Sequence, residues 1–299
     1  MTLGVDVSHW QADRSKKPFI QFDWQKYAAS DAQFCFLRAG YGKYADDCID
    51  YNLPAIQDTG KPFGIYWFYE YRPGVDPGPE AQANRMLEVT KGISGQGGYI
   101  LDFERPSSAW PELPARSRCI DLIERFYGVL DRAGKRAELF YTNPAGNLHL
   151  KPPSSMTTKR KLWVANYQVI KPRVDYWPTW TFWQFTDRLD ASKYGAAPAC
   201  KQIDGNHYNG DEAAMAAFFG SQPPAPPQPE DGVKLKITAN VNIRTQPSTT
   251  GNAAIGIRMA NEEMTATKTF IENSRRVWVK DAKGWSAVVH DGAVFMRGL

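Results

Sequence analysis

Two carboxylates lie two residues apart at the end of a short apolar run, in the sequence YILDFERP of residues 99–106. Because side chains on a strand alternate between its faces, Asp102 and Glu104 are expected on one side and Phe103 on the other. Two nearby carboxyl groups repel each other when ionised, which raises the pKa of at least one. The pair therefore predicts a general acid beside a carboxylate, the combination that cleavage of a glycosidic bond requires.

Other apolar runs of the chain also end in polar side chains. The runs are nearly continuous, as expected of parallel strands covered on both faces, and they span residues 3–8, 34–40, 63–69, 98–104, 137–143, 161–167 and 181–187. Polar residues at their ends include Asp6, Arg38, Tyr69, Tyr141, Asn166, Tyr167 and Gln184. The carboxyl ends of the strands of a parallel barrel open on one face, so these groups are expected to converge on one cleft with the two carboxylates.

Aromatic residues on the same runs agree with a sugar substrate. Tyr66, Trp67 and Tyr69 lie on one run and Trp163 and Tyr167 on another. Their flat apolar faces suit stacking on pyranose rings, and their polar edges suit hydroxyl groups. Core packing is the alternative for each of them, and for Trp67 in particular.

Helical patterns separate several of the apolar runs. Apolar residues recur at helical spacing over 79–92 and 116–133, and residues 211–220 form a last apolar segment. Strands that alternate with helices over about 220 residues predict an α/β fold, an irregular (β/α) TIM-like barrel. A doubly wound sheet is the second choice, but the glycine-rich phosphate motifs that would favour it are absent from the sequence.

The composition changes after residue 220. Residues 221–232 contain five prolines and predict an extended linker, so the chain divides into a catalytic domain (1–220), a linker and a second domain (233–299). Short alternating runs broken by turn residues predict that the second domain is a small all-β barrel. It carries ten Lys and Arg against five Asp and Glu. This excess suggests an anionic partner, with solubility alone as the alternative.

Several classes of function are disfavoured by the sequence. It encodes no long apolar segment and no signal peptide at its start, so membrane insertion is not expected and the product should accumulate in the cytoplasm. The four cysteines are scattered without a C-x-x-C pair, and the four histidines form no H-E-x-x-H motif. No metal, other cofactor or nucleic-acid partner is predicted.

Five ordered motifs resemble the family 25 glycoside hydrolases, muramidases that cleave bacterial peptidoglycan. They are GVDVSHWQ, YILDFE, WVANY, FWQF and IDGNHYNG, between residue 3 and about residue 219. The resemblance implies hydrolysis, with retention, of the β-1,4 bond between N-acetylmuramic acid and N-acetylglucosamine. It also implies Glu104 as the general acid/base, Asp102 as its partner, and Asp6 and Asp204 as further acids of the cleft. Asp102 would either attack the sugar or, as we favour, assist attack by the substrate's own 2-acetamido group.

The second domain resembles a bacterial SH3-like domain in ANVNIRTQPSTTGNAAIG and GWSAV. Such modules of lysins bind wall peptide or polymer, so the whole chain resembles a phage endolysin that waits in the host cytoplasm until lysis. Two alternatives remain open. One is a chitinase-like glycosidase, although the longer D-x-x-D-x-D-x-E signature is absent. The other is a wall-binding protein without catalytic activity.

Overall fold

The structure is a computed structural model that forms two compact units, Met1–Pro224 and Ala225–Leu299. It describes residues 2–93, 95–105, 107, 109–220, 233–246, 253–266, 268–273, 276–281, 283–290 and 293–298. The predicted linker, 221–232, and residues 247–252 of the SH3-like motif lie outside the described residues.

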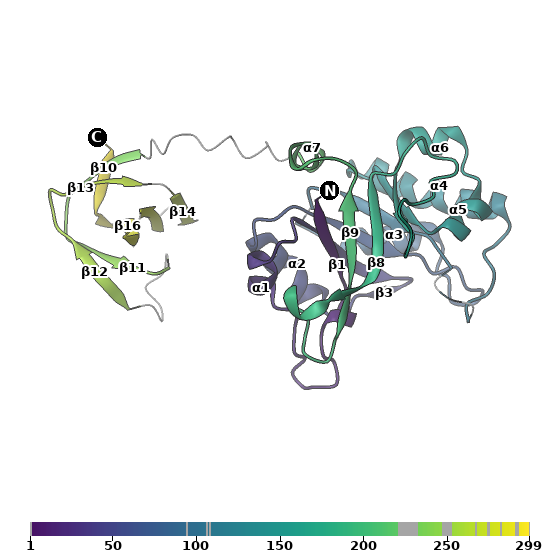
Figure 1. The fold of residues 1–299 in the computed structure, drawn as a ribbon, viewed down its shortest axis with the longest axis horizontal. Coiled ribbons are helices and arrows are strands. Elements are labelled where there is room, and N and C mark those ends of the chain that lie inside the picture. Colours follow the sequence, from purple (N-terminus) through teal and green to yellow (C-terminus); the bar gives the residue numbers. More distant parts are fainter. Residues whose placement is uncertain are drawn as a thin grey trace. The chain divides into compact units, whose positions relative to one another are not determined.

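Eight strands of the described part of the first unit close into a barrel, in the order β1, β9, β8, β7, β6, β5, β4, β2 and back to β1. Neighbouring strands run parallel except at β9, which is antiparallel to both β1 and β8; these three strands lie side by side in Figure 1. The strands are β1 (Leu3–Val7), β2 (Phe34–Tyr41), β3 (Tyr44–Ala45), β4 (Phe63–Phe68), β5 (Tyr99–Asp102), β6 (Leu139–Thr142), β7 (Lys161–Ala165), β8 (Phe182–Asp190) and β9 (Gln202–Tyr208). The predicted irregular barrel is confirmed, and the doubly wound sheet is wrong because the ring closes.

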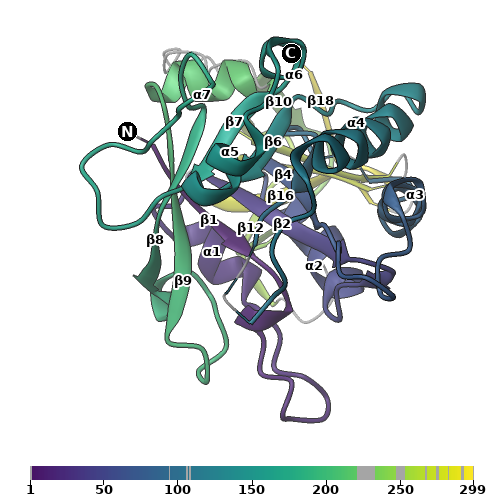
Figure 2. The same cartoon turned by 90° about the vertical axis from the view of Figure 1, so that its right-hand side faces the viewer.

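Helices cover the outside of the barrel, as Figure 2 shows for α2, α3 and α4. The three predicted helical segments are α3, α4 and α7, each within a few residues of its expected ends. The helices are α1 (Trp24–Ala29), α2 (Ile49–Asp58), α3 (Pro79–Val89), α4 (Arg116–Arg132), α5 (Pro144–Leu150), α6 (Ser154–Lys159) and α7 (Glu212–Phe218), with short 3₁₀ turns η1 (His9–Gln11) and η2 (Ala191–Lys193).

Side chains of the strands alternate between the barrel interior and the layer beneath the helices. On β5, Leu101 packs outward into the larger core, whereas Ile100 belongs to the smaller core inside the barrel. The interior is tightly filled, because a Cβ added at Gly4 would lie 2.4 Å from the ring of Phe34. A filled interior leaves the strand ends as the place for a site.

The last helix of the first unit closes one end of this interior. Phe219, next to α7, lies 5.8 Å from Phe34 between ring centroids, and Phe218 lies 5.1 Å from Phe182. Phe34 and Phe182 are the first residues of β2 and β8. The helix therefore covers the amino ends of the parallel strands, opposite to their carboxyl ends.

The second unit consists of antiparallel strands. One sheet has the order β13, β10, β18, and another has the order β12, β11, β16, β15, β14 with β17 paired to β16. The strands are β10 (Val233–Ile237), β11 (Val241–Arg244), β12 (Ala254–Arg258), β13 (Glu263–Ala266), β14 (Lys268–Asn273), β15 (Arg276–Asp281), β16 (Gly284–His290), β17 (Ala293–Val294) and β18 (Met296–Gly298). The all-β prediction is confirmed, and the SH3-like assignment stays a prediction.

Within the described residues, none of the helices combines the length and the apolar character needed to cross a lipid bilayer.

Candidate active site

A cleft of about 480 Å³ opens at the carboxyl ends of the parallel strands. Ten of the thirteen residues that the sequence predicts for the site line it: Asp6, Arg38, Tyr66, Asp102, Glu104, Tyr141, Trp163, Tyr167, Gln184 and Asp204. They come from all eight strands of the barrel or from the loops that follow them. A volume of this size lies within the range of small-ligand pockets, roughly 300–1,000 Å³.

Asp6 and Asp204 are neighbours because of strand register. Asp6 on β1 stands directly opposite Asp204 on the antiparallel strand β9, and residues opposite each other share one face. Their carboxyl groups lie close enough for each to affect the pKa of the other. Burial raises the pKa of both groups, and the nearby Asp6 charge raises that of Asp204 further. Burial therefore opposes the presence of a negative charge on both groups at once.

A buried network holds Asp6 in place. Its Oδ2 accepts hydrogen bonds of 2.8 Å from the side-chain amides of Gln184 and Asn206. The Oε1 of Gln184 in turn accepts from the hydroxyl groups of Tyr141 and Tyr167 at 2.9 and 2.5 Å. Asn206, which is fully buried, also accepts from the indole Nε1 of Trp163 at 2.8 Å. These bonds fix the floor of the cleft before any substrate binds.

Asp102 and Glu104 occupy the cleft as the strand alternation predicts. Asp102 is the last residue of β5 and is buried, and Glu104 follows it by two residues and is half-buried. Glu104 Oε2 accepts a 2.8 Å hydrogen bond from Nδ2 of Asn143. Asp102 Oδ1 is buried and has no hydrogen-bond partner among the described residues. A buried oxygen without a hydrogen-bond partner is unusual in a folded protein. Because Asp102 lines the cleft, a ligand bound there would supply the missing hydrogen bond.

Burial dominates the proton affinity of both carboxyl groups. It raises the pKa of Glu104 to about 7, with a smaller contribution from the charge of Asp6 and an opposing one from the Asn143 hydrogen bond. Burial also raises the pKa of Asp102, as do the charges of Glu104 and Asp6, whereas Arg38 lowers it. Glu104 can therefore hold a proton near neutral pH, as a general acid must.

Three predicted binding residues do not line the cleft. Trp67 points to the outer face of β4, because its neighbour Tyr66 points inward, and it is fully buried in the core beneath the helices. Tyr69 is also fully buried and packs 5.2 Å from the ring of Phe103. Asn166 accepts a hydrogen bond from the backbone N–H of Arg173 instead of facing the cleft. The expectation that these three contact a sugar is corrected accordingly.

Five further residues line the cleft that the sequence prediction omitted: Ser8, Trp10, Gln11, Phe68 and Trp110. Trp10 has 63% of its surface exposed, an unusual amount for tryptophan. The guanidinium carbon of Arg14 lies 4.9 Å from its ring centroid. The sequence contained one indication that Trp10 lines the cleft, because this residue follows directly after the first apolar run.

No cluster of His, Cys, Asp or Glu side chains suited to holding a metal ion occurs in the part of the chain that the structure describes.

The sequence signature of the family described as "Glycosyl hydrolases family 25" matches residues 5–193. The chain belongs to family 25 of the glycosyl hydrolases. The match covers more than half of the chain, from β1 to η2, and includes Asp6, Asp102 and Glu104. This glycosyl hydrolase is therefore an enzyme, and the resemblance drawn from the five motifs is confirmed at the level of the family.

Solved structures of other proteins show the same fold. A bacterial lysozyme from Streptomyces coelicolor is 26% identical, with a TM-score of 0.58, and the alignment covers 73% of this chain and 96% of that one. A muramidase from Acremonium alcalophilum is 21% identical, with a TM-score of 0.56 and coverage of 73% and 99%. The CTP1L endolysin is 19% identical, with a TM-score of 0.55 and coverage of 78% and 71%. No curated protein matches the sequence at a significant level.

Proposed function

We propose that this family 25 hydrolase is a muramidase that cleaves the β-1,4 bond between N-acetylmuramic acid and N-acetylglucosamine in peptidoglycan. The observation that carries the proposal is the carboxyl pair itself. Glu104, with a pKa raised to about 7, lies in one cleft with Asp102, whose Oδ1 has no partner among the described residues. A protonated acid and an acceptor together suit a substrate that carries both a glycosidic oxygen and an amide N–H.

The first step would use both groups. Glu104 gives its proton to the glycosidic oxygen as the bond from that oxygen to the anomeric carbon breaks. The oxygen of the 2-acetamido group forms the new bond to the anomeric carbon, and its N–H donates to Oδ1 of Asp102. That hydrogen bond favours the ionised form of Asp102, opposing the burial that raises its pKa in the free enzyme. The ionised carboxylate then stabilises the positive charge of the oxazolinium ion.

The second step would return the enzyme to its starting state. Glu104, now ionised, takes a proton from water while the water oxygen attacks the anomeric carbon and the acetamido oxygen leaves. Two displacements at the same carbon give retention of configuration. The competing route makes Asp102 the nucleophile, and its signature is a glycosyl ester on Asp102. Detection of that ester by mass spectrometry after rapid quenching would contradict the substrate-assisted route and support Asp102 as the nucleophile.

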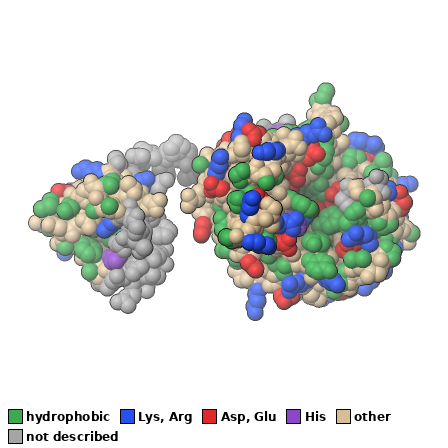
Figure 3. Space-filling view, turned by 90° about the horizontal axis from the view of Figure 1, so that it is seen from below, with side chains coloured by type: hydrophobic (Ala, Val, Ile, Leu, Met, Phe, Trp, Pro, Cys, Tyr) green, Lys and Arg blue, Asp and Glu red, His purple; other side chains and the backbone are tan. Residues whose placement is uncertain are grey.

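The C-terminal unit would attach the enzyme to the wall. Ile257 and Met259 are 60% and 52% exposed, and both line a cavity of about 420 Å³ that also includes Asn242. Hydrophobic side chains are visible on the surface of this unit in Figure 3. Exposed apolar groups beside polar ones, on a domain of net charge +5, suit a wall peptide or anionic polymer. In a phage endolysin such a unit would act after the membrane is breached at lysis.

The bond that is cut decides between this function and its alternatives. Purified peptidoglycan is incubated with the enzyme, and new reducing ends and new free amines are measured in parallel, with chitin as a second substrate. Reducing ends from peptidoglycan alone support the proposal. Reducing ends from chitin alone would support the chitinase-like alternative, and wall binding without either product would indicate a wall-binding protein lacking activity.

A further inference from the structure

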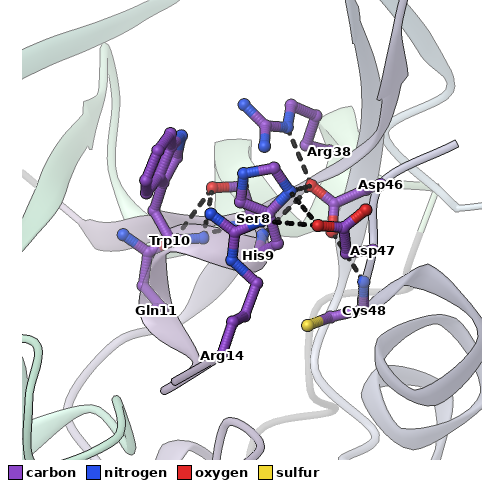
Figure 4. Close-up of polar contacts among 9 residues, drawn as sticks. All are labelled: Ser8, His9, Trp10, Gln11, Arg14, Arg38, Asp46, Asp47 and Cys48. Carbon is purple, nitrogen blue, oxygen red and sulfur yellow. Dashed lines mark hydrogen bonds and ion pairs between the residues drawn. The ribbon is translucent and has the colours of Figure 1, made fainter. Parts of the chain in front are cut away.

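Asp46 lies outside the predicted site, yet its buried carboxylate joins three segments around the cleft, as Figure 4 shows. Its Oδ2 accepts from Nε of Arg38 at 2.9 Å and from the backbone N–H of His9 at 3.0 Å. Its Oδ1 accepts from the backbone N–H of Cys48 at 3.1 Å, just before α2. The side chain has no exposed surface, so its geometry is set by the protein alone.

Arg38 is the cationic partner in this group. The imidazole of His9 comes within 3.4 Å of Asp46, but burial and the charge of Arg38 lower the pKa of His9 to about 4, so it is neutral near pH 7. Arg14 is engaged with Asp47 at 2.5 Å. A buried carboxylate requires a paired charge, and Arg38 supplies it.

The same guanidinium also faces the cleft. Arg38 is among the cleft-lining residues, and its Nη2 is buried without a hydrogen-bond partner among the described residues. No ion pair joins Arg38 to Asp6 or Asp102 in the described part of the chain, although its charge lowers the pKa of both. Asp46 thus holds one edge of the guanidinium, while Nη2 on another edge has no acceptor within the described part of the chain.

We propose that Asp46 is a positioning residue, which holds Arg38 by its Nε so that Nη2 donates to an oxygen of the bound sugar. Guanidinium geometry is rigid, so fixing Nε also fixes the direction of the other nitrogens. Without Asp46, Arg38 would turn toward the carboxylates of Asp6 and Asp102 and form an ion pair with them. The substrate would then lose a hydrogen-bond donor, and the Arg38 side chain would occupy the floor of the cleft.

A double-mutant cycle tests this relation and rests on the proposed muramidase function, because turnover is measured on soluble peptidoglycan fragments. Asp46→Asn and Arg38→Met are each expected to lower kcat/KM by roughly tenfold to a hundredfold, mainly through KM, as for a lost hydrogen bond to a charged group. The double variant is expected to be no worse than Arg38→Met. Losses that multiply in the double variant would show that Asp46 acts independently of Arg38 and would overturn the proposal.

Two further variants separate positioning from folding. Asp131→Asn breaks an ion pair with Arg160, an arginine that is 11% exposed against 12% for Arg38. Asp131 itself is 50% exposed, whereas Asp46 is fully buried, so this variant controls for the loss of an Asp–Arg pair and should leave kcat/KM unchanged. Arg38→Lys keeps a charge for Asp46 but offers no second nitrogen, so it should lose activity even if Asp46→Asn fails to fold. Full activity of Arg38→Lys would contradict the proposal. A wild-type enzyme that releases no reducing ends would instead refute the muramidase function itself.

Discussion

Asn143 connects Glu104 to a helix. Its Nδ2 donates a hydrogen bond of 2.8 Å to Oε2 of Glu104, while its Oδ1 accepts one of 2.8 Å from the backbone N–H of Gly146 and caps α5. The cap orients the amide, and the amide then favours the ionised form of Glu104. The pKa of Glu104 is therefore set by two opposing effects, burial that raises it and this hydrogen bond that lowers it.

Replacing Asn143 by Ser should move the alkaline limb of activity upward. Serine retains a hydroxyl oxygen for the helix cap but is too short to reproduce the amide contact with Glu104. Without that contact the pKa of Glu104 rises, so the protonated acid survives to higher pH. The measurement is the pH profile of kcat/KM on soluble peptidoglycan fragments. A limb that stays in place, or moves to lower pH, would disprove this role of Asn143.

Glu104→Gln should abolish most turnover and stabilise the fold at alkaline pH. In the wild type the folded pKa is about 7 against the usual 4.5, so between these values the folded state keeps a proton that the unfolded state has released. The free energy of unfolding therefore falls as pH rises toward 7, by on the order of 2 kcal/mol after allowing for partial exposure. Gln does not titrate.

Thermal melts at pH 4 and pH 8 check the sign. The variant should melt above the wild type at pH 8, and the difference should shrink at pH 4. Equal differences at both pH values would mean that Glu104 is not the titrating group. Turnover should drop by roughly 10²–10⁴-fold, the usual contribution of a general acid.

Trp10→Ala should weaken glycan binding by about tenfold in KM, equivalent to about 1.4 kcal/mol, with little change in kcat. The exposed indole lines the cleft and is supported by Arg14 on one side, which suits it to stack on a sugar ring. Trp10→Phe should retain most of the binding. Tyr176→Ala is the matched control, since Tyr176 is 41% exposed but does not line the cleft. Equal increases in KM for Trp10→Ala and Tyr176→Ala would show that Trp10 does not bind the sugar.

The double change Ile257→Ser and Met259→Ser should reduce sedimentation of the enzyme with purified cell walls several-fold. Turnover of soluble fragments should stay the same, because these residues belong to the C-terminal unit. Val294→Ser serves as the control, since Val294 is 59% exposed and does not line the cavity. Undiminished wall binding in the double variant would place the wall contact elsewhere.

The apolar runs and their alternation predicted most of the barrel and cleft. Parallel strands that are buried on both faces consist of nearly continuous apolar residues, which can be recognised in the sequence. The same alternation, applied to β4, excludes Trp67 from the face that Tyr66 occupies. Strand β9 was missed because Gln-Ile-Asp-Gly-Asn-His contains no apolar run, and pairing with β1 and β8 stabilises it instead. Asp46 was also missed, because its role depends on contacts with Arg38 and His9 that only the folded chain creates.

The identity of the new reducing sugar tests the central claim most directly. Peptidoglycan is digested with wild type and with Glu104→Gln, the products are reduced with borohydride, and the reduced sugars are identified after acid hydrolysis. We predict reduced muramic acid with the wild type and almost none with the variant. Reduced glucosamine, free amines without reduced sugar, or undiminished release by the variant would contradict a muramidase in which Glu104 is the general acid.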